Sequence, residues 1–397
     1  MEEVGIYIHF PFCKSRCDYC DFNTCASMES HIPAYCQNLH KEIKLISQHF
    51  KNDFHIRSIY LGGGTPSYLP PENIRQVIQT VLQNFMICPD VEISMEANPA
   101  DIVPSKAVVW HTTGINRLSI GMQSAHDEEL AMLGRRHRWL DVQQAVQIAK
   151  DAGFTNINLD VMFGLPGQSM QEWRSTVEKA LSLAPTHLSL YALTVEEDTP
   201  LMHKLADGKL PQVDEDLAGD MYEWVMEYLS QHGFEQYEIS NWAQQENDVD
   251  YRCQHNLLYW RNETYLGFGS AAHSHYGSNR WSNKTGILEY IKSVNDADDS
   301  GLFKLPFPWG DMYEELNLSE EMNDTAMMGL RLVKEGLRDD LFIQKFGCSL
   351  FEVYHDQIEE LCAEELLAVD HNGEGSIYLT RRGCMVGNQV FMRFLSD

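Results

Sequence analysis

The sequence predicts an α/β protein with a partial, TIM-like (β/α)6 barrel, followed by a smaller helical domain of winged-helix type. Strand-like and helix-like patterns alternate six times over about the first 195 residues, which is typical of parallel strands covered by helices. Glycines or polar residues follow nearly every strand, and parallel barrels gather their chemistry at the carboxyl ends of their strands. Six units are too few to close an eight-stranded barrel. We therefore expect an open partial barrel rather than a flat, doubly wound sheet.

Each expected strand is a short run of apolar residues, and each expected helix has apolar residues at helical spacing. The strands are predicted at 4–10, 56–61, 91–95, 117–122, 156–163 and 187–193. The helices between them are predicted at 31–50, 73–85, 139–152 and 170–183. Gly153 directly follows the third of these helices, which is a common way for a helix to stop. These elements define an expected barrel domain over residues 1–212.

The middle of the chain is expected to extend the barrel over residues 213–302. A helix is predicted at 217–232, and a segment rich in aromatic residues and histidines then runs to His275. Composition shifts at 301–311, which contains Pro306 and Pro308, and we interpret this stretch as a linker.

The last expected domain, 312–397, combines helices with a small hairpin. Helices are predicted at 324–335, 337–346, 350–365 and 382–395, strands at 367–369 and 376–379, and a turn at Asn372–Gly373. This order resembles a winged helix, a fold that often binds DNA. The region holds more acidic than basic residues, however, so we expect no DNA binding.

Charge and composition narrow the range of partners and compartments. The net charge is −28, from 30 Lys and Arg against 58 Asp and Glu, which disfavours binding to nucleic acid or to anionic lipid. No apolar run approaches the length of a membrane span. The chain starts Met1-Glu2-Glu3 without the pattern of a secretory signal. Ten cysteines in such a chain predict a reducing cytoplasm, in which thiols stay free to bind metal.

The most specific motif is formed by Cys13, Cys17 and Cys20, at C-x3-C-x2-C spacing after the first expected strand. Three thiolates on a short loop can hold three corners of a cubane iron–sulfur cluster and leave the fourth iron without a protein ligand. Zinc and disulfide sites are the alternatives. Zinc usually takes four ligands, yet the nearest further cysteine is Cys25 and no second C-x2-C exists. Disulfides would need an oxidising compartment.

With Tyr19 before its last cysteine, this loop resembles the cluster motif of the radical S-adenosylmethionine (SAM) superfamily. Within that superfamily, Tyr7-Ile-His-Phe-Pro-Phe-Cys13, Gly62-Gly-Gly-Thr-Pro66 and the stretch from Asn158-Leu-Asp160 to Gly164-Leu-Pro-Gly167 resemble the oxygen-independent coproporphyrinogen III oxidases. The resemblance covers essentially the whole chain. It implies a radical SAM barrel with a 4Fe–4S cluster, whose open iron would chelate the amino and carboxylate groups of SAM and whose reduction would yield a 5′-deoxyadenosyl radical.

The resemblance also implies which residues contact SAM or lie beside the cluster. They are Tyr7, Tyr19, Gly63, Gly64, Thr65, Glu96, Gln123, Arg135, Asp160 and Ala192. The glycines would let the backbone approach the SAM amino group. Glu96 ends an apolar strand, where a charge without a ligand would be costly to bury. Asp160 would accept hydrogen bonds from both ribose hydroxyls. For Tyr7 and Ala192, plain packing in the barrel core is an alternative interpretation.

Several features depart from the oxidase pattern. Phe22 stands where the oxidases have a fourth cysteine, only six residues precede Tyr7, and the chain is shorter than an oxidase. The run from His255 to Trp260, His-Asn-Leu-Leu-Tyr-Trp, resembles the H-N-x-x-Y-W haem-binding signature of the HemW family of haem chaperones. Histidine is a standard axial ligand of haem iron, and aromatic rings offer flat faces to a macrocycle. A buried core histidine and ligation by Cys253 are the alternatives.

We therefore expect a haem chaperone that binds a 4Fe–4S cluster, SAM and haem and delivers haem to respiratory haem proteins. Its partners would be haem and the proteins that accept it, and a homodimer and a peripheral contact with the membrane are compatible with this role. The second hypothesis is an oxygen-independent coproporphyrinogen III oxidase, and the third is another radical SAM enzyme such as a methyltransferase. The sequence assigns no catalytic residue.

Overall fold

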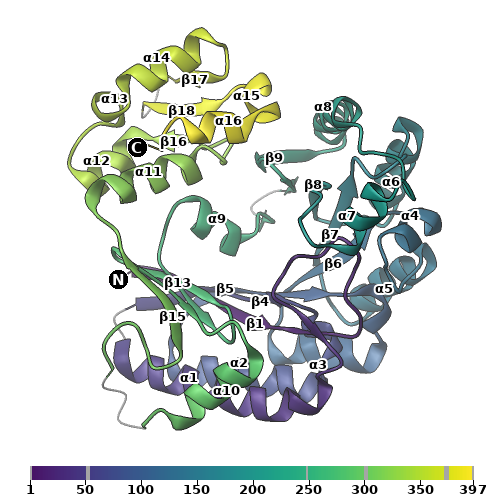
Figure 1. The fold of residues 1–397 in the computed structure, drawn as a ribbon, viewed down its shortest axis with the longest axis vertical. Helices are drawn as coiled ribbons and strands as arrows, with labels where there is room; N and C mark the ends of the chain where they lie inside the picture. Colours follow the sequence, from purple (N-terminus) through teal and green to yellow (C-terminus); the bar gives the residue numbers. More distant parts are fainter. Residues whose placement is uncertain (1, 51–53, 247–248, 299–302, 371–374, 396–397) are drawn as a thin grey trace.

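The computed structural model describes residues 2–50, 54–246, 249–298, 303–370 and 375–395 (Figure 1). Its central feature is a run of six parallel strands that neighbour one another in chain order. They are β1 (Glu2–Phe10), β4 (Phe54–Gly63), β5 (Met86–Ala97), β6 (Arg117–Gln123), β7 (Asn156–Phe163) and β8 (His187–Ala192). A doubly wound sheet would reverse its strand order at a switch point. The order seen here does not reverse, which confirms the predicted partial barrel.

Helices cover the outer face of these strands (Figure 1). They are α1 (Ile32–Phe50), α2 (Pro71–Asn84), α3 (Pro104–Thr113), α4 (Asp127–Met132), α5 (Trp139–Asp151) and α6 (Met170–Ser182). The four helices predicted here agree with α1, α2, α5 and α6 to within two residues at either end. The helix α3 was not among the predicted elements. It ends at Gly114, whose φ of +108° suits a residue without a Cβ.

The chain between the barrel and the C-terminal helices extends the sheet at both edges. At one edge, β10 (Asn241–Glu246) pairs antiparallel with β8. Two further strands, β11 (Val249–Asp250) and β9 (Phe234–Glu238), each pair with β10. β12 (Tyr265–Phe268) pairs parallel with β1 at the other edge, followed by β13 (His273–Tyr276), β14 (Asn279–Asn283) and β15 (Gly310–Glu315). The predicted helix at 217–232 is α8 (Glu215–Gln231).

The stretch predicted as a linker is not one over its described part. Phe307 and Trp309 are buried with their rings stacked, at 5.2 Å between centroids, and β15 then joins the sheet. The prolines that suggested a linker instead precede and follow a buried phenylalanine. Residues 301–302 lie outside the described part of the chain. β15 also runs across residue 312, where the last domain was expected to begin.

The C-terminal part contains helices around a small sheet, as predicted, but their bounds differ. Its helices are α11 (Leu318–Gly329), α12 (Asp339–Phe346), α13 (Leu350–Val353), α14 (His355–Ala363), α15 (Arg381–Met385) and α16 (Gly387–Met392). Its sheet has the order β16 (Leu337–Arg338), β18 (Ser376–Leu379), β17 (Leu367–Val369).

Three of the predicted C-terminal helices need correction. The first begins earlier, because Asn317 and Glu320 form a reciprocal cap that apolar periodicity does not reveal. The third predicted helix, 350–365, is divided in two at Tyr354, and the last, 382–395, is divided at Val386. The predicted turn at Asn372–Gly373 lies outside the described residues. Among the described residues, no helix combines the length and the apolar composition that crossing a membrane requires.

A buried carboxylate joins the sheet extension to the barrel. Glu42 of α1 has an exposed fraction of 0 %. It accepts hydrogen bonds from the backbone N–H of Gly269 at 2.9 Å, from the amide of Asn283 at 2.6 Å and from the hydroxyl of Tyr290 in α10 (Ile287–Asp296). Burial raises the pKa of Glu42 to about 7. Three of the hydrogen bonds that hold this extension against α1 therefore converge on a single side chain.

We expect Glu42→Gln to lower the free energy of unfolding by about 1–3 kcal/mol, because the new amide group would meet donors where the carboxylate met donors. Urea denaturation at neutral pH measures the effect. Glu178→Gln, on an exposed face of α6, is the control and should change stability little. Equal stabilities of the two variants would contradict this role for Glu42.

Candidate functional site

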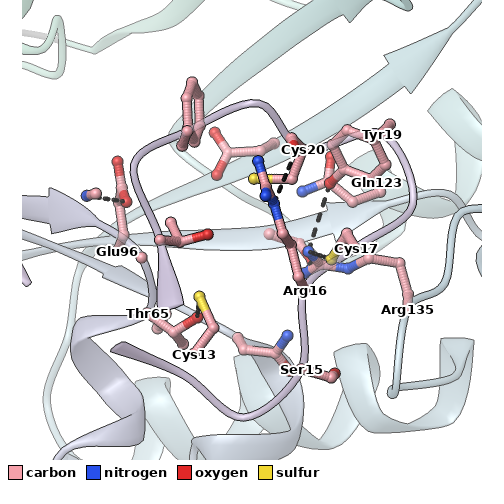
Figure 2. Close-up of a pocket in the computed structure, with 18 of the residues that line it drawn as sticks. Cys13, Ser15, Arg16, Cys17, Tyr19, Cys20, Thr65, Glu96, Gln123 and Arg135 are labelled. Carbon is pink, nitrogen blue, oxygen red and sulfur yellow. Dashed lines mark hydrogen bonds between the residues drawn. The ribbon is translucent and has the colours of Figure 1, made fainter. Parts of the chain in front are cut away.

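A cavity of about 430 Å³ lies at the carboxyl ends of the parallel strands. Its walls come from the cysteine loop after β1, from the glycine loop after β4 and from the ends of β5, β6 and β7 (Figure 2). The predicted site residues that line it are Cys13, Cys17, Tyr19, Cys20, Gly63, Gly64, Thr65, Glu96, Gln123, Arg135 and Asp160. The parallel barrel thus brings together side chains that are up to 147 positions apart in the sequence.

The three motif cysteines are free thiols at this cavity. The Sγ atom of Cys13 is hydrogen bonded to Oγ1 of Thr65 at 3.4 Å, and Nη1 of Arg135 donates to Sγ of Cys17 at 3.3 Å (Figure 2). Burial raises the pKa of the Cys13 and Cys20 thiols, so both are protonated at neutral pH until a metal displaces the proton. Cys25 lies in β3 (Cys25–Ala26), next to β2 (Phe12–Cys13), and is not among the lining residues.

The glycine loop is packed against the cysteine loop. The N–H of Gly64 donates to the carbonyl oxygen of Phe10 at 2.8 Å, and that of Thr65 donates to the carbonyl oxygen of Phe12 at 3.0 Å. A Cβ at position 64 would come within 2.6 Å of the first of these oxygens. Only glycine fits there, because the two backbones are nearly in contact. The glycines therefore fix where the cysteine loop sits, in addition to lining the cavity.

Two half-buried carboxylates face the cavity. Glu96 accepts from the Tyr60 hydroxyl at 3.0 Å and from the N–H of Gly63 at 3.2 Å. Asp160 accepts from the Ser119 hydroxyl at 3.0 Å and from the Asn158 amide at 2.7 Å. Burial raises the pKa of both groups, and the neighbouring Asp160 adds to the effect on Glu96, whose pKa reaches about 7. A cationic ligand that carries hydrogen-bond donors would relieve this repulsion.

Arg135 connects β6 to the cysteine loop. Its Nη2 donates to the carbonyl oxygen of Gly121 at 3.0 Å, and its Nη1 donates to the hydroxyl of Tyr19 at 3.4 Å as well as to Cys17. Its neighbour Arg136 also lines the cavity and is paired with Asp101.

The residues at the cavity fit a cluster and a cationic nucleoside such as SAM. The Nε atom of Arg135 and Oγ1 of Thr24 are buried at the cavity with no hydrogen-bond partner among the described residues. Such orphaned polar atoms are rare in folded proteins unless a ligand or water completes them. Three thiols suit the irons of a cluster, and two carboxylates suit an ammonium group and hydroxyl donors.

Three predicted site residues do not line the cavity. The Tyr7 hydroxyl is hydrogen bonded to Nδ1 of His9 at 3.0 Å, and its ring stacks on that of Tyr60 below the cavity. Ala192 ends β8, and its neighbour Tyr191 lines the cavity in its place. The third is His255, discussed next.

His255 lies in α9 (Gln254–Trp260), a short helix between the barrel and the C-terminal part (Figure 1). Its exposed fraction is 1 %, and both of its ring nitrogens are taken: Nδ1 by the Ser58 hydroxyl at 2.8 Å and Nε2 by the Tyr259 hydroxyl at 3.0 Å. Cys253 is buried too, and its thiol donates to Glu92 at 3.6 Å. As folded, neither side chain fits the role of a haem ligand.

Some lining residues were missed by the sequence analysis. They include Arg16, Phe22, Tyr60, Ser119, Gly121 and Tyr191. A signal for two of them was present, because alternate residues of a strand face the same side. Ser119 and Gly121 precede the predicted Gln123 at steps of two along β6. Phe22 is exposed by 65 % at the cavity, and its place two residues after Cys20 in the cysteine loop was the signal for that position.

Comparison with known proteins agrees with this geometry. Residues 7–180 match the Radical SAM superfamily, and residues 316–386 match the HemN C-terminal domain. Among solved structures, coproporphyrinogen III oxidase (HemN) from Escherichia coli, described as a radical SAM enzyme, superposes with a TM-score of 0.82. The match covers 99% of this chain and 90% of that one at 22% identity, which shows a shared fold.

Curated relatives have a higher sequence identity to this chain than that solved structure has. The heme chaperone HemW of Bacillus subtilis is 35% identical over 393 residues, which cover 98% of this chain and 99% of that protein. HemW of Escherichia coli is 36% identical over 274 residues, covering 68% and 69% of the two chains. A mitochondrial radical S-adenosyl methionine domain-containing protein 1 from Danio rerio is 35% identical over 94% of this chain and 83% of its own length. By its motifs, its fold and these identities, the chain belongs to the HemW family of the radical SAM superfamily.

Proposed function

We propose that this chain is a radical SAM haem chaperone of the cytoplasm. It would hold a 4Fe–4S cluster on Cys13, Cys17 and Cys20, bind SAM in the adjoining cavity, and carry haem to respiratory haem proteins. The observation that carries the first part is the convergence of three thiols and two half-buried carboxylates, Glu96 and Asp160, on one cavity. The names of the HemW relatives support the haem part. A homodimer and a peripheral contact with the membrane stay predictions from the sequence.

The residues of the chain have separable tasks in this proposal. Asp160 accepts hydrogen bonds from the ribose hydroxyls, with Ser119 and Asn158 holding its carboxylate in place. Glu96 accepts from the ammonium group of the methionyl part. Arg135 keeps the cysteine loop against β6. When bound, the cluster and SAM together supply one-electron cleavage of a C–S bond, and the protein's contribution is orientation and exclusion of water.

The main rival is coproporphyrinogen III oxidase activity. The shared fold does not decide between the two, since a fold hosts several functions. Phe22 supports the chaperone: it brings an exposed apolar ring to the cavity where the oxidase pattern has a thiol. The two functions also differ in a measurable way, because one holds a macrocycle and the other changes it.

We expect Cys17→Ser to abolish the broad visible absorbance of the anaerobically reconstituted cluster while the far-ultraviolet circular dichroism stays unchanged, because the alcohol is a poor ligand for iron. Cys25→Ser, five residues beyond the motif and outside the cavity, is the matched control and should keep its iron. Full absorbance in Cys17→Ser would contradict the assigned cluster ligands.

We expect Asp160→Asn to weaken SAM binding about tenfold or more, because a hydrogen bond to a charged acceptor contributes roughly 1.5–3 kcal/mol. Equilibrium dialysis against the reconstituted protein measures the affinity. Asp151→Asn, exposed at the end of α5, should bind as the wild type does.

The affinity of the wild type for SAM should rise with pH through about 7, the pKa of Glu96. The sign follows from the charge: the ammonium group prefers the ionised carboxylate, which forms as the pH exceeds this pKa. Dialysis over a pH series measures the profile. An affinity that is constant or falls across this range would contradict an interaction between Glu96 and a cation.

The choice between chaperone and oxidase can be made in one anaerobic assay with SAM, reductant and coproporphyrinogen III. We expect no protoporphyrinogen, and we expect saturable haem binding in a parallel absorbance titration. Turnover of coproporphyrinogen III with no haem binding would establish the oxidase instead.

A further inference from the structure

We propose that His255 is a positioning residue of the SAM site, where it holds Tyr60 in place to donate to Glu96. In this role it is not an open axial ligand for haem. The inference rests on the proposed binding of SAM in the cavity. It assigns to the H-N-x-x-Y-W segment a task in that site, which His255 performs without touching the ligand.

The ring of His255 packs against one face of two neighbouring strands of the barrel, β1 and β4. On one side it stacks on the ring of Tyr60 in β4, with 5.2 Å between centroids and 23° between planes. On another it meets the backbone of β1, where a Cβ added to Gly5 would come within 3.2 Å of the imidazole. A histidine packed this closely cannot turn away from Tyr60 without a shift of the helix or of a strand.

Tyr60 connects this ring to the cavity. Its hydroxyl donates to Oε1 of Glu96 at 3.0 Å, while Oε2 of Glu96 is held by the N–H of Gly63. Tyr60 itself lines the cavity, and His255 does not. Three side chains in series, His255, Tyr60 and Glu96, therefore lead from α9 to the carboxylate that faces the ligand. Because the ring position fixes the hydroxyl, the stacking on His255 determines where Glu96 finds its donor.

The helix that carries His255 is fixed at both ends. At its start, Glu92 of β5 accepts from the N–H of Gln254 at 3.1 Å and from that of His255 at 3.4 Å. At its end, Arg261 donates to Glu335 through two hydrogen bonds, of 3.0 and 2.6 Å. These contacts join α9 to the barrel and to the C-terminal part at once.

A third contact holds the end of the helix. The guanidinium of Arg331 lies over the ring of Trp260 at 4.4 Å. Freeing a ring nitrogen of His255 for iron would break its hydrogen bond with Ser58 or with Tyr259. Bringing the ring to a macrocycle would also require the contacts at both ends of α9 to break. Burial also lowers the pKa of His255 to about 3, so the ring is neutral and suited to stacking.

The decisive experiment measures SAM affinity by equilibrium dialysis on anaerobically reconstituted His255→Ala, Tyr60→Phe and the double variant. We expect each single variant to bind about tenfold more weakly, since each costs Glu96 a well-placed donor. The double variant should bind no more weakly than Tyr60→Phe, because His255 acts through that hydroxyl. His275→Ala removes another buried histidine, one that makes no ring contact with Tyr60, and should bind as the wild type does.

Two further readouts separate positioning from a merely structural role. His255→Ala costs Glu96 the Tyr60 hydroxyl, whose hydrogen bond lowers the pKa of that carboxyl, so the pKa of Glu96 rises and the pH profile of SAM binding shifts to higher pH. Asp160 and Arg117, the other charged groups near Glu96, are unchanged. His255→Phe keeps a flat ring against Tyr60 but has no nitrogen. It should retain SAM affinity within about threefold and bind haem as the wild type does, and it also tests the proposal if His255→Ala fails to fold.

The outcomes distinguish this inference from the proposed function. Loss of haem binding in His255→Phe and His255→Ala with SAM affinity and pH profile intact would make His255 a haem ligand and overturn the inference. Additive losses in the double variant would overturn it as well, because they would mean that His255 does not act through Tyr60. Failure of the wild type itself to bind SAM would instead overturn the proposed function.

Discussion

The placing of two half-buried carboxylates side by side inside a partial barrel is the constraint on which the rest of the site depends. Glu96 and Asp160 lie on β5 and β7, separated only by β6, and burial raises the pKa of both. The surrounding residues compensate with donors: Tyr60 and Gly63 for one carboxylate, Ser119 and Asn158 for the other. Both groups still face the same cavity. A site of this kind is complementary to a cation with hydroxyl donors, and it tolerates no bulky apolar ligand at this position.

The parallel strand order explains how this pair of carboxylates meets the cysteine loop. Neighbouring parallel strands end at the same edge of a sheet, so the loops after β1 and β4 come into contact there. Gly64 permits that contact, because any side chain would collide with the backbone of the cysteine loop. Arg135 then binds the far side of the loop to β6. The position of the thiols is thus set by backbone packing and by one guanidinium, before any metal is added.

The H-N-x-x-Y-W segment shows why a motif needs its environment. As a sequence it presents a histidine and two aromatic residues, the usual components of a haem site. In the fold, Tyr259 is used to hold His255, Trp260 lies under Arg331, and the imidazole faces Tyr60. The same residues become part of a connection between the cavity proposed to bind SAM and the C-terminal part of the chain.

The sequence by itself determined the six strands, the helices α1, α2, α5 and α6, and the cluster motif, because apolar periodicity and cysteine spacing are local properties of the chain. The resemblance to a known family also pointed to Glu96, Gln123 and Asp160, and the structure brings all three to one cavity, since residues that end neighbouring parallel strands must meet. Only the tertiary structure decided that Ser119 and Tyr60 hold the carboxylates, that Phe307 and Trp309 pack in the core, and that His255 is enclosed. The reason is physical: whether a side chain is buried, and which hydrogen-bond partners remain for it, depends on segments far away in the sequence that local patterns do not record.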